Sequence, residues 1–332
     1  MKDADIVIEL KHDKDGAWKT DPEMFDWLVS RFGAKFVRDR LQDQIKHANK
    51  IFDRGRRLRH IENSEWVMVI LYWGLRLIGL YDRGYRNFFD IQTVENEVFI
   101  KNLPDAFDGY RILHLSDLHL DSDENLKNVV AKVIEPVEYD LALVTGDFRA
   151  STGGSYQMAI DETVAFMETM PEPVYAILGN HDFLEFVKPL EDYAKLTFLV
   201  NESLPIEKDG ESIWLSGVDD PNMYQMDNLK MAYENVPDDA VKILMSHSPE
   251  TWKEAAALGV DFMMSGHTHG GQICLPGGIA LIVHAKCPRS FINGPWRHKN
   301  LQGYTSPGTG GCGVPVRFNC PPENTIHTLR KG

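Results

Sequence analysis

The amino-acid sequence predicts an α/β domain with a mainly buried sheet, preceded by a helical amino-terminal region. From residue 110 onward, short apolar runs alternate with helical patterns, which is typical of α/β folds. Before that point, helical periodicity dominates. The apolar runs are RILHLS, LALVTG, VYAILGN, KILMSH and FMMSGH. We therefore divide the chain into a helical region, residues 1–105, and an α/β domain, residues 106–332.

Two helices are expected near the start of the chain. Asp21, Pro22 and Glu23 fit an N-cap and first turn, and Gly33 fits a C-terminal stop. The second helix is expected over residues 35–53, because apolar residues recur there at steps of three and four. They form one face: Val37, Leu41, Ile45, Ala48 and Phe52.

Residues 66–86, WVMVILYWGLRLIGLYDRGYR, form the most apolar stretch of the chain. A membrane-spanning helix needs about 20 apolar residues, so this segment is too short and too charged to cross comfortably. Wound as a helix, it carries a narrow polar stripe on an otherwise apolar cylinder. The stripe consists of Glu65, Arg76 and Arg83. Another surface must therefore cover the segment.

Charge is segregated along the chain. The 35 Lys/Arg and 49 Asp/Glu give a net charge of −14. Residues 31–60 hold ten Lys/Arg against three Asp, which is +7 and leaves −21 for the remainder. Together with the aromatic residues of 66–86, this basic charge is what an anionic membrane surface would attract. A helical cap on the domain or a dimer interface fits the same pattern. Membrane contact, a cap and a dimer interface are therefore all open interpretations of residues 31–86.

The remaining composition restricts location and partners. Four cysteines without Cys-x-x-Cys spacing indicate reduced thiols. The start, MKDADIVIELKHDKDG, has no apolar core of signal-peptide length. We therefore expect a cytoplasmic protein, peripheral on the inner face of the membrane if residues 31–86 contact lipid. The acidic domain lacks a basic, aromatic-interleaved stripe, which argues against a nucleic-acid partner.

Five clusters of metal-binding residue types follow the apolar runs in order: DLH, GD, GNHD, SH and GHTH. Strand ends are where α/β sheets assemble their sites, so these clusters are expected at one edge. Asp and Asn oxygens mixed with imidazoles suit Mn, Fe or Zn. One cation cannot accept all the side chains, so two divalent metal ions are predicted. The candidate ligands are Asp117, His119, Asp147, Asn180, His247, His267 and His269.

The ordered series D-x-H, G-D, G-N-H, H and G-H-x-H resembles the hallmark of the calcineurin-like metallophosphoesterase family, over about residues 106–332. The resemblance implies a sandwich of two mixed sheets flanked by helices. It implies one metal held by Asp117, His119, Asp147 and His269. It implies a second held by Asp147, Asn180, His247 and His267, so that Asp147 bridges the two. His181 would lie beside the substrate phosphate as a catalytic residue.

The expected reaction is hydrolysis of a phosphoester or pyrophosphate bond. Two cations about 3.5–4 Å apart can share a hydroxide that attacks phosphorus in line. A histidine beside the leaving group typically contributes about 10²–10⁴-fold in rate, and His181 is the candidate. Arg149 and Arg317 are candidate phosphate contacts, with a structural role as the more common alternative for each.

Substrate and branch are less specific in the sequence. Ala150 stands where many family members have a second Asp, and Asp121 where many have Gly. The Gly-Gly-Gln after His269 and the run GTGGCGVPVRFNCPPE resemble a bacterial branch with an amino-terminal membrane-contacting segment. If residues 31–86 contact the membrane, we expect an amphiphilic substrate, a phospholipid or a nucleotide-linked lipid. The alternatives are a soluble phosphodiesterase of small-molecule or nucleotide substrates, and a non-catalytic binding scaffold, which the complete ligand set disfavours.

Overall fold

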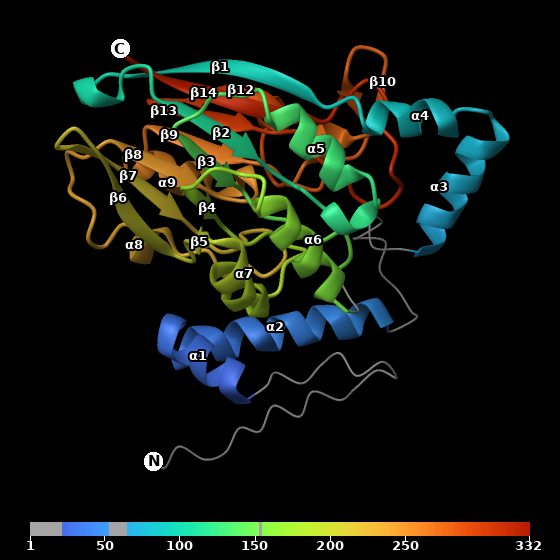
Figure 1. The fold of residues 1–332 in the computed structure, drawn as a ribbon, viewed down its shortest axis with the longest axis horizontal. Helices are drawn as coiled ribbons and strands as arrows, with labels where there is room; N and C mark the ends of the chain where they lie inside the picture. Colours follow the sequence, from blue (N-terminus) through green and yellow to red (C-terminus); the bar gives the residue numbers. More distant parts are fainter. Residues whose placement is uncertain (1–21, 53–64, 153–154) are drawn as a thin grey trace.

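The computed structural model describes residues 22–52, 65–152 and 155–332, and it confirms the predicted two-sheet sandwich (Figure 1). The first sheet consists of β1 (Gln92–Ile100), β14 (Glu323–Lys331), β2 (Arg111–Leu115), β3 (Leu141–Val144), β4 (Val174–Ala176) and β5 (Leu196–Phe198), in that order. The second consists of β12 (Gly294–His298), β13 (Leu301–Thr305), β9 (Phe262–Ser265), β8 (Lys242–Met245), β7 (Glu211–Gly217) and β6 (Glu202–Lys208). A small hairpin pairs β10 (Cys274–Leu275) with β11 (Ile279–Ala280).

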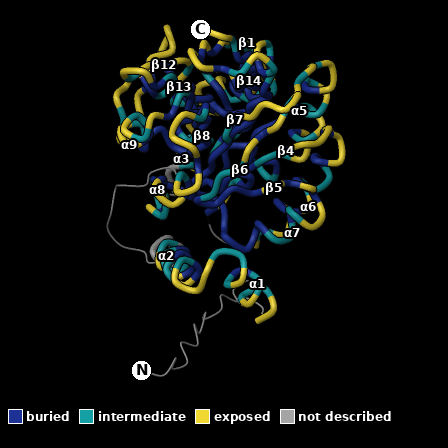
Figure 2. The backbone as a smooth tube through the Cα atoms, turned by 90° about the vertical axis from the view of Figure 1, so that its left-hand side faces the viewer, coloured by how far each residue is buried: buried dark blue, intermediate teal, exposed yellow. Residues whose placement is uncertain are grey.

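The five predicted apolar runs are the strands that carry the site. They become β2, β3 and β4 in the first sheet and β8 and β9 in the second, and neighbours among them pair in parallel. Alternate residues face opposite sides, so Ile112 joins the core between the sheets while Leu113 packs under the outer helices. Figure 2 shows this buried interior in dark blue. Parallel pairing places the carboxyl ends of β2, β3 and β4 at one edge of the first sheet, and those of β8 and β9 at one edge of the second.

Helices cover the outer face of each sheet. The first sheet is covered by α5 (Leu126–Ile134), α6 (Gln157–Met167) and α7 (Val187–Ala194). The second is covered by α8 (Leu229–Ala232) and α9 (Trp252–Ala257). Each helix buries one apolar stripe against a sheet, and the resulting cores hold the strand ends in fixed positions.

The two predicted amino-terminal helices are present as α1 (Pro22–Phe32) and α2 (Ala34–Phe52). Gly33 ends α1 with a φ of +83°, a conformation that glycine adopts at little cost. Val37 and Leu41 are buried in the core beneath α7, as the periodicity indicated. The predicted cap Asp21 and the side chains of Ala48 and Phe52 lie outside the described residues.

The inner face of α2 is not purely apolar, because it carries the buried Arg40. Its guanidinium donates to Asp219 Oδ2 at 2.8 Å and to the carbonyl of Asp182 at 3.1 Å, and lies 3.4 Å over the ring of Tyr224. Neighbouring Gln44 accepts the backbone N–H of Leu184 at 2.7 Å. The helix is therefore fixed to the loop after β4, which supports the helical-cap interpretation for this part of residues 31–86.

Breaking the buried pair should destabilise the whole protein. We expect Arg40→Met to lower the free energy of unfolding by about 3–5 kcal/mol, because Asp219 would remain buried without its cation. Urea denaturation followed by circular dichroism measures the change. Arg38→Met, on the exposed face of the same helix, should change stability by no more than about 0.5 kcal/mol. Equal free energies of unfolding for the two variants would contradict a stabilising role of the Arg40–Asp219 ion pair.

The apolar segment 66–86 is two helices, which corrects the single helix considered from the sequence. α3 (Glu65–Leu77) and α4 (Tyr81–Phe88) are separated at Gly79, whose φ is +71°. A regular helix does not continue through that backbone conformation, so Arg83 in α4 is not aligned with Arg76 in α3 as one helix would require. The side chain of Glu65 lies outside the described residues. Across the described ranges, the structure contains no helix with the length and hydropathy needed to span a bilayer.

The first sheet begins before residue 105, after which the sequence predicted the start of the α/β domain. β1 pairs in parallel with β14 over nine residues, from Gln92 opposite Glu323 to Ile100 opposite Lys331. The strand forms one edge of the first sheet. Its exposed side chains are mostly polar, so the segment lacks the apolar run that marks the central strands.

Candidate metal centre

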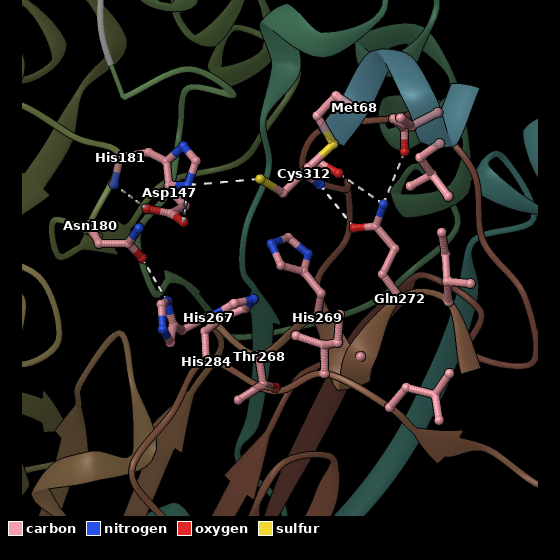
Figure 3. Close-up of a pocket in the computed structure, with 16 residues that line it drawn as sticks. Met68, Asp147, Asn180, His181, His267, Thr268, His269, Gln272, His284 and Cys312 are labelled. Carbon is pink, nitrogen blue, oxygen red and sulfur yellow. Dashed lines mark hydrogen bonds and ion pairs between the residues drawn. The ribbon is translucent and has the colours of Figure 1, made fainter. Parts of the chain in front are cut away.

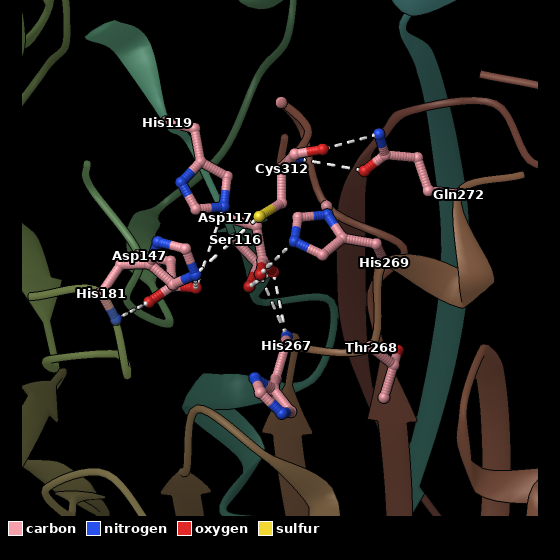
Figure 4. Close-up of polar contacts among 12 residues, drawn as sticks. Ser116, Asp117, His119, Asp147, His181, His267, Thr268, His269, Gln272 and Cys312 are labelled. Carbon is pink, nitrogen blue, oxygen red and sulfur yellow. Dashed lines mark hydrogen bonds and ion pairs between the residues drawn. The ribbon is translucent and has the colours of Figure 1, made fainter. Parts of the chain in front are cut away.

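Loops after five strands meet in one buried site (Figure 4). The loops after β2, β3 and β4 come from the first sheet and those after β8 and β9 from the second. The sequence predicted one edge of one sheet, whereas the site lies where the ends of both sheets converge. All seven candidate ligands gather there: Asp117, His119, Asp147, Asn180, His247, His267 and His269.

The backbone bends sharply at these positions. Five of the seven candidate ligands have positive φ angles between 42° and 68°: Asp117, His119, Asp147, His267 and His269. Non-glycine residues in this region cost about 1–2 kcal/mol each, and such strain gathers at functional sites. The turns aim successive side chains of one loop at a common point.

Two glycines of the motifs are required by close approach. A Cβ at Gly179 would lie 2.1 Å from Asp147 Oδ1, and a Cβ at Gly266 would lie 1.8 Å from Ser116 Oγ. Real Cβ atoms do not approach so closely, so a side chain at either position would push a candidate ligand out of place. The glycines before Asn180 and His267 thus follow from packing at the site.

The first group of candidate ligands consists of Asp117, His119 and His269. His269 Nε2 lies 3.4 Å from Asp117 Oδ1, and His119 Nε2 lies 3.8 Å from Asp147 Oδ2. His119 Nδ1 donates to the carbonyl of Arg149 at 2.5 Å, which fixes the ring and turns Nε2 toward the site.

The second group gathers around Asn180. His267 Nδ1 and His247 Nε2 lie 2.6 and 3.0 Å from Asn180 Oδ1, and His247 Nε2 is 3.2 Å from Asp147 Oδ2. His247 Nδ1 donates to the carbonyl of Thr145 at 2.7 Å. Asp147 Oδ2 therefore lies between the two groups, as expected of a bridging carboxylate.

The electrostatics of the site fit bound cations. Burial opposes a charge on His247, but the carboxylate of Asp147 outweighs it and raises the pKa of His247 to about 10. Three buried ring nitrogens have no hydrogen-bond partner among the described residues: His119 Nε2, His267 Nε2 and His269 Nδ1. Buried polar atoms are nearly always satisfied, and metal coordination would satisfy atoms of this kind. A bound cation would also take over the charge balance that a proton gives on His247.

His181 lies beside Asp147 and His119 at the site. Its backbone N–H donates to Asp147 Oδ1 at 2.8 Å, and Nδ1 donates to the carbonyl of Ala150 at 2.9 Å. Nε2 lies 3.9 Å from Asp147 Oδ2 and 3.9 Å from Cys312 Sγ (Figure 3). His181 also lines the cavity in front of the candidate ligands. Burial lowers the pKa of His181 to about 4. The ring is therefore neutral at pH 7 before a substrate binds.

Asp182 positions the loops of the site and was not among the predicted site residues. Its carboxylate accepts the backbone N–H groups of Asp147, Phe148 and Gly179 at 2.8–2.9 Å. It ties the loop after β3 to the loop after β4, and so positions the bridging carboxylate. Burial and the nearby Asp147 raise the pKa of Asp182 to about 6. Its position directly after Gly-Asn-His is the sequence feature that could have marked it as part of the site.

Both candidate arginines are buried. Arg317 is buried and donates to the carbonyls of Pro307, Gly308 and Gly310 and of His269. Arg149 is buried with its guanidinium 4.5 Å over the ring of Phe183. Neither lines the cavity in front of the ligands. We therefore assign Arg317 a structural role in holding the loop that carries His269. All four cysteines are described, and each is a free thiol.

Histidines, aspartates and an asparagine from the ends of both sheets meet in one buried site, which is typical of metallohydrolases. Comparisons with known proteins identify the family. A family model for calcineurin-like phosphoesterases matches residues 110–271. The chain belongs to this family of metal-dependent phosphoesterases, and the buried histidines and aspartates are consistent with a two-metal site.

Three similar proteins show the extent of the match. The uncharacterized metallophosphoesterase YkoQ of Bacillus subtilis is 28% identical, over 74% of this chain and 93% of its own length. The uncharacterized protein YpbG of Bacillus subtilis is 30% identical, over 57% of this chain and 70% of its own. The structure of Haemophilus influenzae NAD nucleotidase is 16% identical with a TM-score of 0.39, over 61% of this chain and 45% of that chain.

Proposed function

We propose that the protein is a two-metal phosphoester hydrolase. The observation that carries the proposal is the position of Asp147 Oδ2, which lies 3.8 Å from His119 Nε2 and 3.2 Å from His247 Nε2. One carboxylate thereby serves two groups of buried ligands. When bound, two divalent ions supply a hydroxide near neutral pH and neutralise charge on the phosphoryl oxygens.

The side chains of the site divide the work. Asp117, His119 and His269 would hold one ion, Asn180, His247 and His267 the other, and Asp147 both. Carbonyls of Arg149 and Thr145 keep the rings of His119 and His247 oriented. A bound phosphate brings negative charge next to His181, which favours its protonated form and lets Nε2 assist the leaving group.

Metal content and hydrolysis test this function together. After loading with manganese, iron or zinc, the full-length protein should bind two equivalents and hydrolyse 4-nitrophenyl phosphate or bis(4-nitrophenyl) phosphate. The ratio of the two activities separates a monoesterase from a diesterase. One equivalent or none, together with no hydrolysis of either ester, would favour the binding-scaffold alternative.

For the substrate, we infer an amphiphile, a phospholipid or a nucleotide-linked lipid, presented at the inner face of the membrane. The exposed apolar side chains of α3 support it, among them Ile70, Trp73 and Leu77. Among the described basic residues of 31–60, Lys35 and Arg38 are exposed, whereas Arg40 is buried and Arg31 pairs with Glu202. Arg54, Arg56, Arg57 and Arg59 lie outside the described residues. Small-molecule or nucleotide diesters are the alternative substrates.

Membrane binding should be electrostatic in part. We expect the full-length protein to float with anionic vesicles at low salt and to dissociate as salt rises, because the Debye length is only about 8 Å at physiological ionic strength. Each basic residue near such a surface contributes about 1 kcal/mol. Changing Arg54, Arg56, Arg57 and Arg59 to Gln should therefore reduce flotation strongly. A wild-type protein that stays in solution at low salt would contradict membrane contact.

A further inference from the structure

The cavity in front of the metal centre has two chemically different walls (Figure 3). Its volume is about 330 Å³. One wall presents polar groups of the centre, including Asp147, Asn180 and His181. A second part of the lining, here called the apolar wall, consists of Met68, Leu71, Ile273, Leu281, Ile282 and Val314. A phosphate group uses only the polar wall, so the apolar wall must contact a different part of a ligand.

Two segments build the apolar wall, and both continue outward to the protein surface. On α3, Met68 and Leu71 face the cavity, while Ile70, Trp73 and Leu77 are 69%, 64% and 88% exposed. Leu281 and Ile282, from the second segment, also line the cavity, and they are 61% and 52% exposed. A helix that is apolar all round needs cover on both sides.

The wall is rigidly attached to the domain through α4. The backbone N–H of Arg317 donates to the carbonyl of Gly84 at 2.9 Å, and Asn87 donates back to the carbonyl of Arg317 at 2.9 Å. Gly84 packs so closely that a Cβ there would lie 2.6 Å from the ring of Phe318. Leu75 of α3 packs with Val314 and Val316. The apolar wall is therefore preformed, which lowers the entropy cost of binding a ligand there.

We propose that this wall binds a hydrocarbon chain of the substrate while the phosphate lies at the metal centre. The proposal rests on the proposed phosphoesterase function and narrows its substrate to lipids whose chain enters the protein. A ligand that is anionic at one end and apolar at the other uses both walls at once. A second copy of the chain would cover the outer face of α3 but would leave the inner wall without an occupant.

Chain-length dependence of binding tests the proposal without relying on turnover. The probes are methyl-, butyl- and hexylphosphonate, which have no ester bond to hydrolyse, titrated calorimetrically below their micelle concentrations into the manganese-loaded full-length protein. Burial of one methylene is worth about fourfold in affinity, so hexylphosphonate should bind at least about 100-fold more tightly than methylphosphonate. Equal dissociation constants across the series would overturn the proposal.

Variants locate the effect. Leu71→Gln and Ile282→Gln should each lower the hexyl-to-methyl affinity ratio about tenfold or more, since both place an amide on the wall. Ile282 is exposed, so its variant should fold even if Leu71→Gln does not. Met158→Gln, at an exposed methionine on α6, should leave the ratio unchanged. Variants that keep the ratio but alter the sedimentation coefficient would assign the α3 surface to a dimer and overturn the proposal.

The two hypotheses fail in different ways. If all chain lengths bind with equal affinity to a protein that hydrolyses aryl phosphates, the hypothesis of a hydrocarbon-binding wall is refuted and the phosphoesterase function stands. If affinity rises with chain length but the protein hydrolyses no phosphate ester, the proposed function is refuted and the hydrocarbon site stands.

Discussion

Asp147→Ala should abolish phosphoester hydrolysis, with a loss of more than about 10⁴-fold, or about 5.5 kcal/mol of transition-state stabilisation. Its Oδ2 lies between both groups of ligands, and its Oδ1 accepts the backbone N–H of His181. The change therefore removes the shared ligand and loosens the loop that carries Asn180. Steady-state kinetics with 4-nitrophenyl phosphate and metal analysis of the same sample measure both effects.

Asp147→Asn separates charge from shape. The amide retains an acceptor for the N–H of His181 but loses the negative charge that compensates two cations, so it should lose nearly as much activity as the alanine variant. Asp121→Asn is the matched control, because Asp121 accepts the N–H of Ala150 in the same region and is not a candidate ligand. Its loss should be about 10–100-fold at most. Full metal content and activity in Asp147→Asn would refute the bridging role.

His181→Ala should retain two metal equivalents while turnover falls about 10²–10⁴-fold. In the role proposed above, Nε2 of His181 assists the leaving group, while Nδ1 donates a hydrogen bond to the carbonyl of Ala150. The loss should shrink for a nitrophenolate leaving group, which needs little protonation, and should be largest for an alkoxide. Comparing aryl and alkyl phosphate esters in both proteins measures this difference.

Two results would change the role of His181. Equal losses for both leaving groups would indicate phosphate positioning. Loss of one metal equivalent would make His181 a ligand, an alternative that the structure allows because His119, Asp147 and His181 also lie within reach of one ion. His181→Asn provides a further comparison, since its amide can donate a hydrogen bond but cannot supply a proton at neutral pH.

The sequence determined the class of the protein because its chemistry is local. Each candidate ligand follows an apolar run within a few residues, and parallel strands must bring such positions to a common edge. Asp117, Asp147 and His267 could therefore be named without knowing how the strands are ordered. The helices α1 and α2 were also predicted, since their caps and periodicity are properties of short segments.

Only the tertiary structure decided features that depend on distant contacts. The partner of Arg40 is Asp219, 179 residues away, and no local pattern marks a basic residue that will be buried. The strand β1 is identified by pairing with the far end of the chain, and Arg317 by carbonyls that surround it after folding. The apolar wall likewise joins Met68 to Ile282 across more than 200 positions of sequence. Periodicity reports which side of an element is apolar, whereas only packing determines what that side meets.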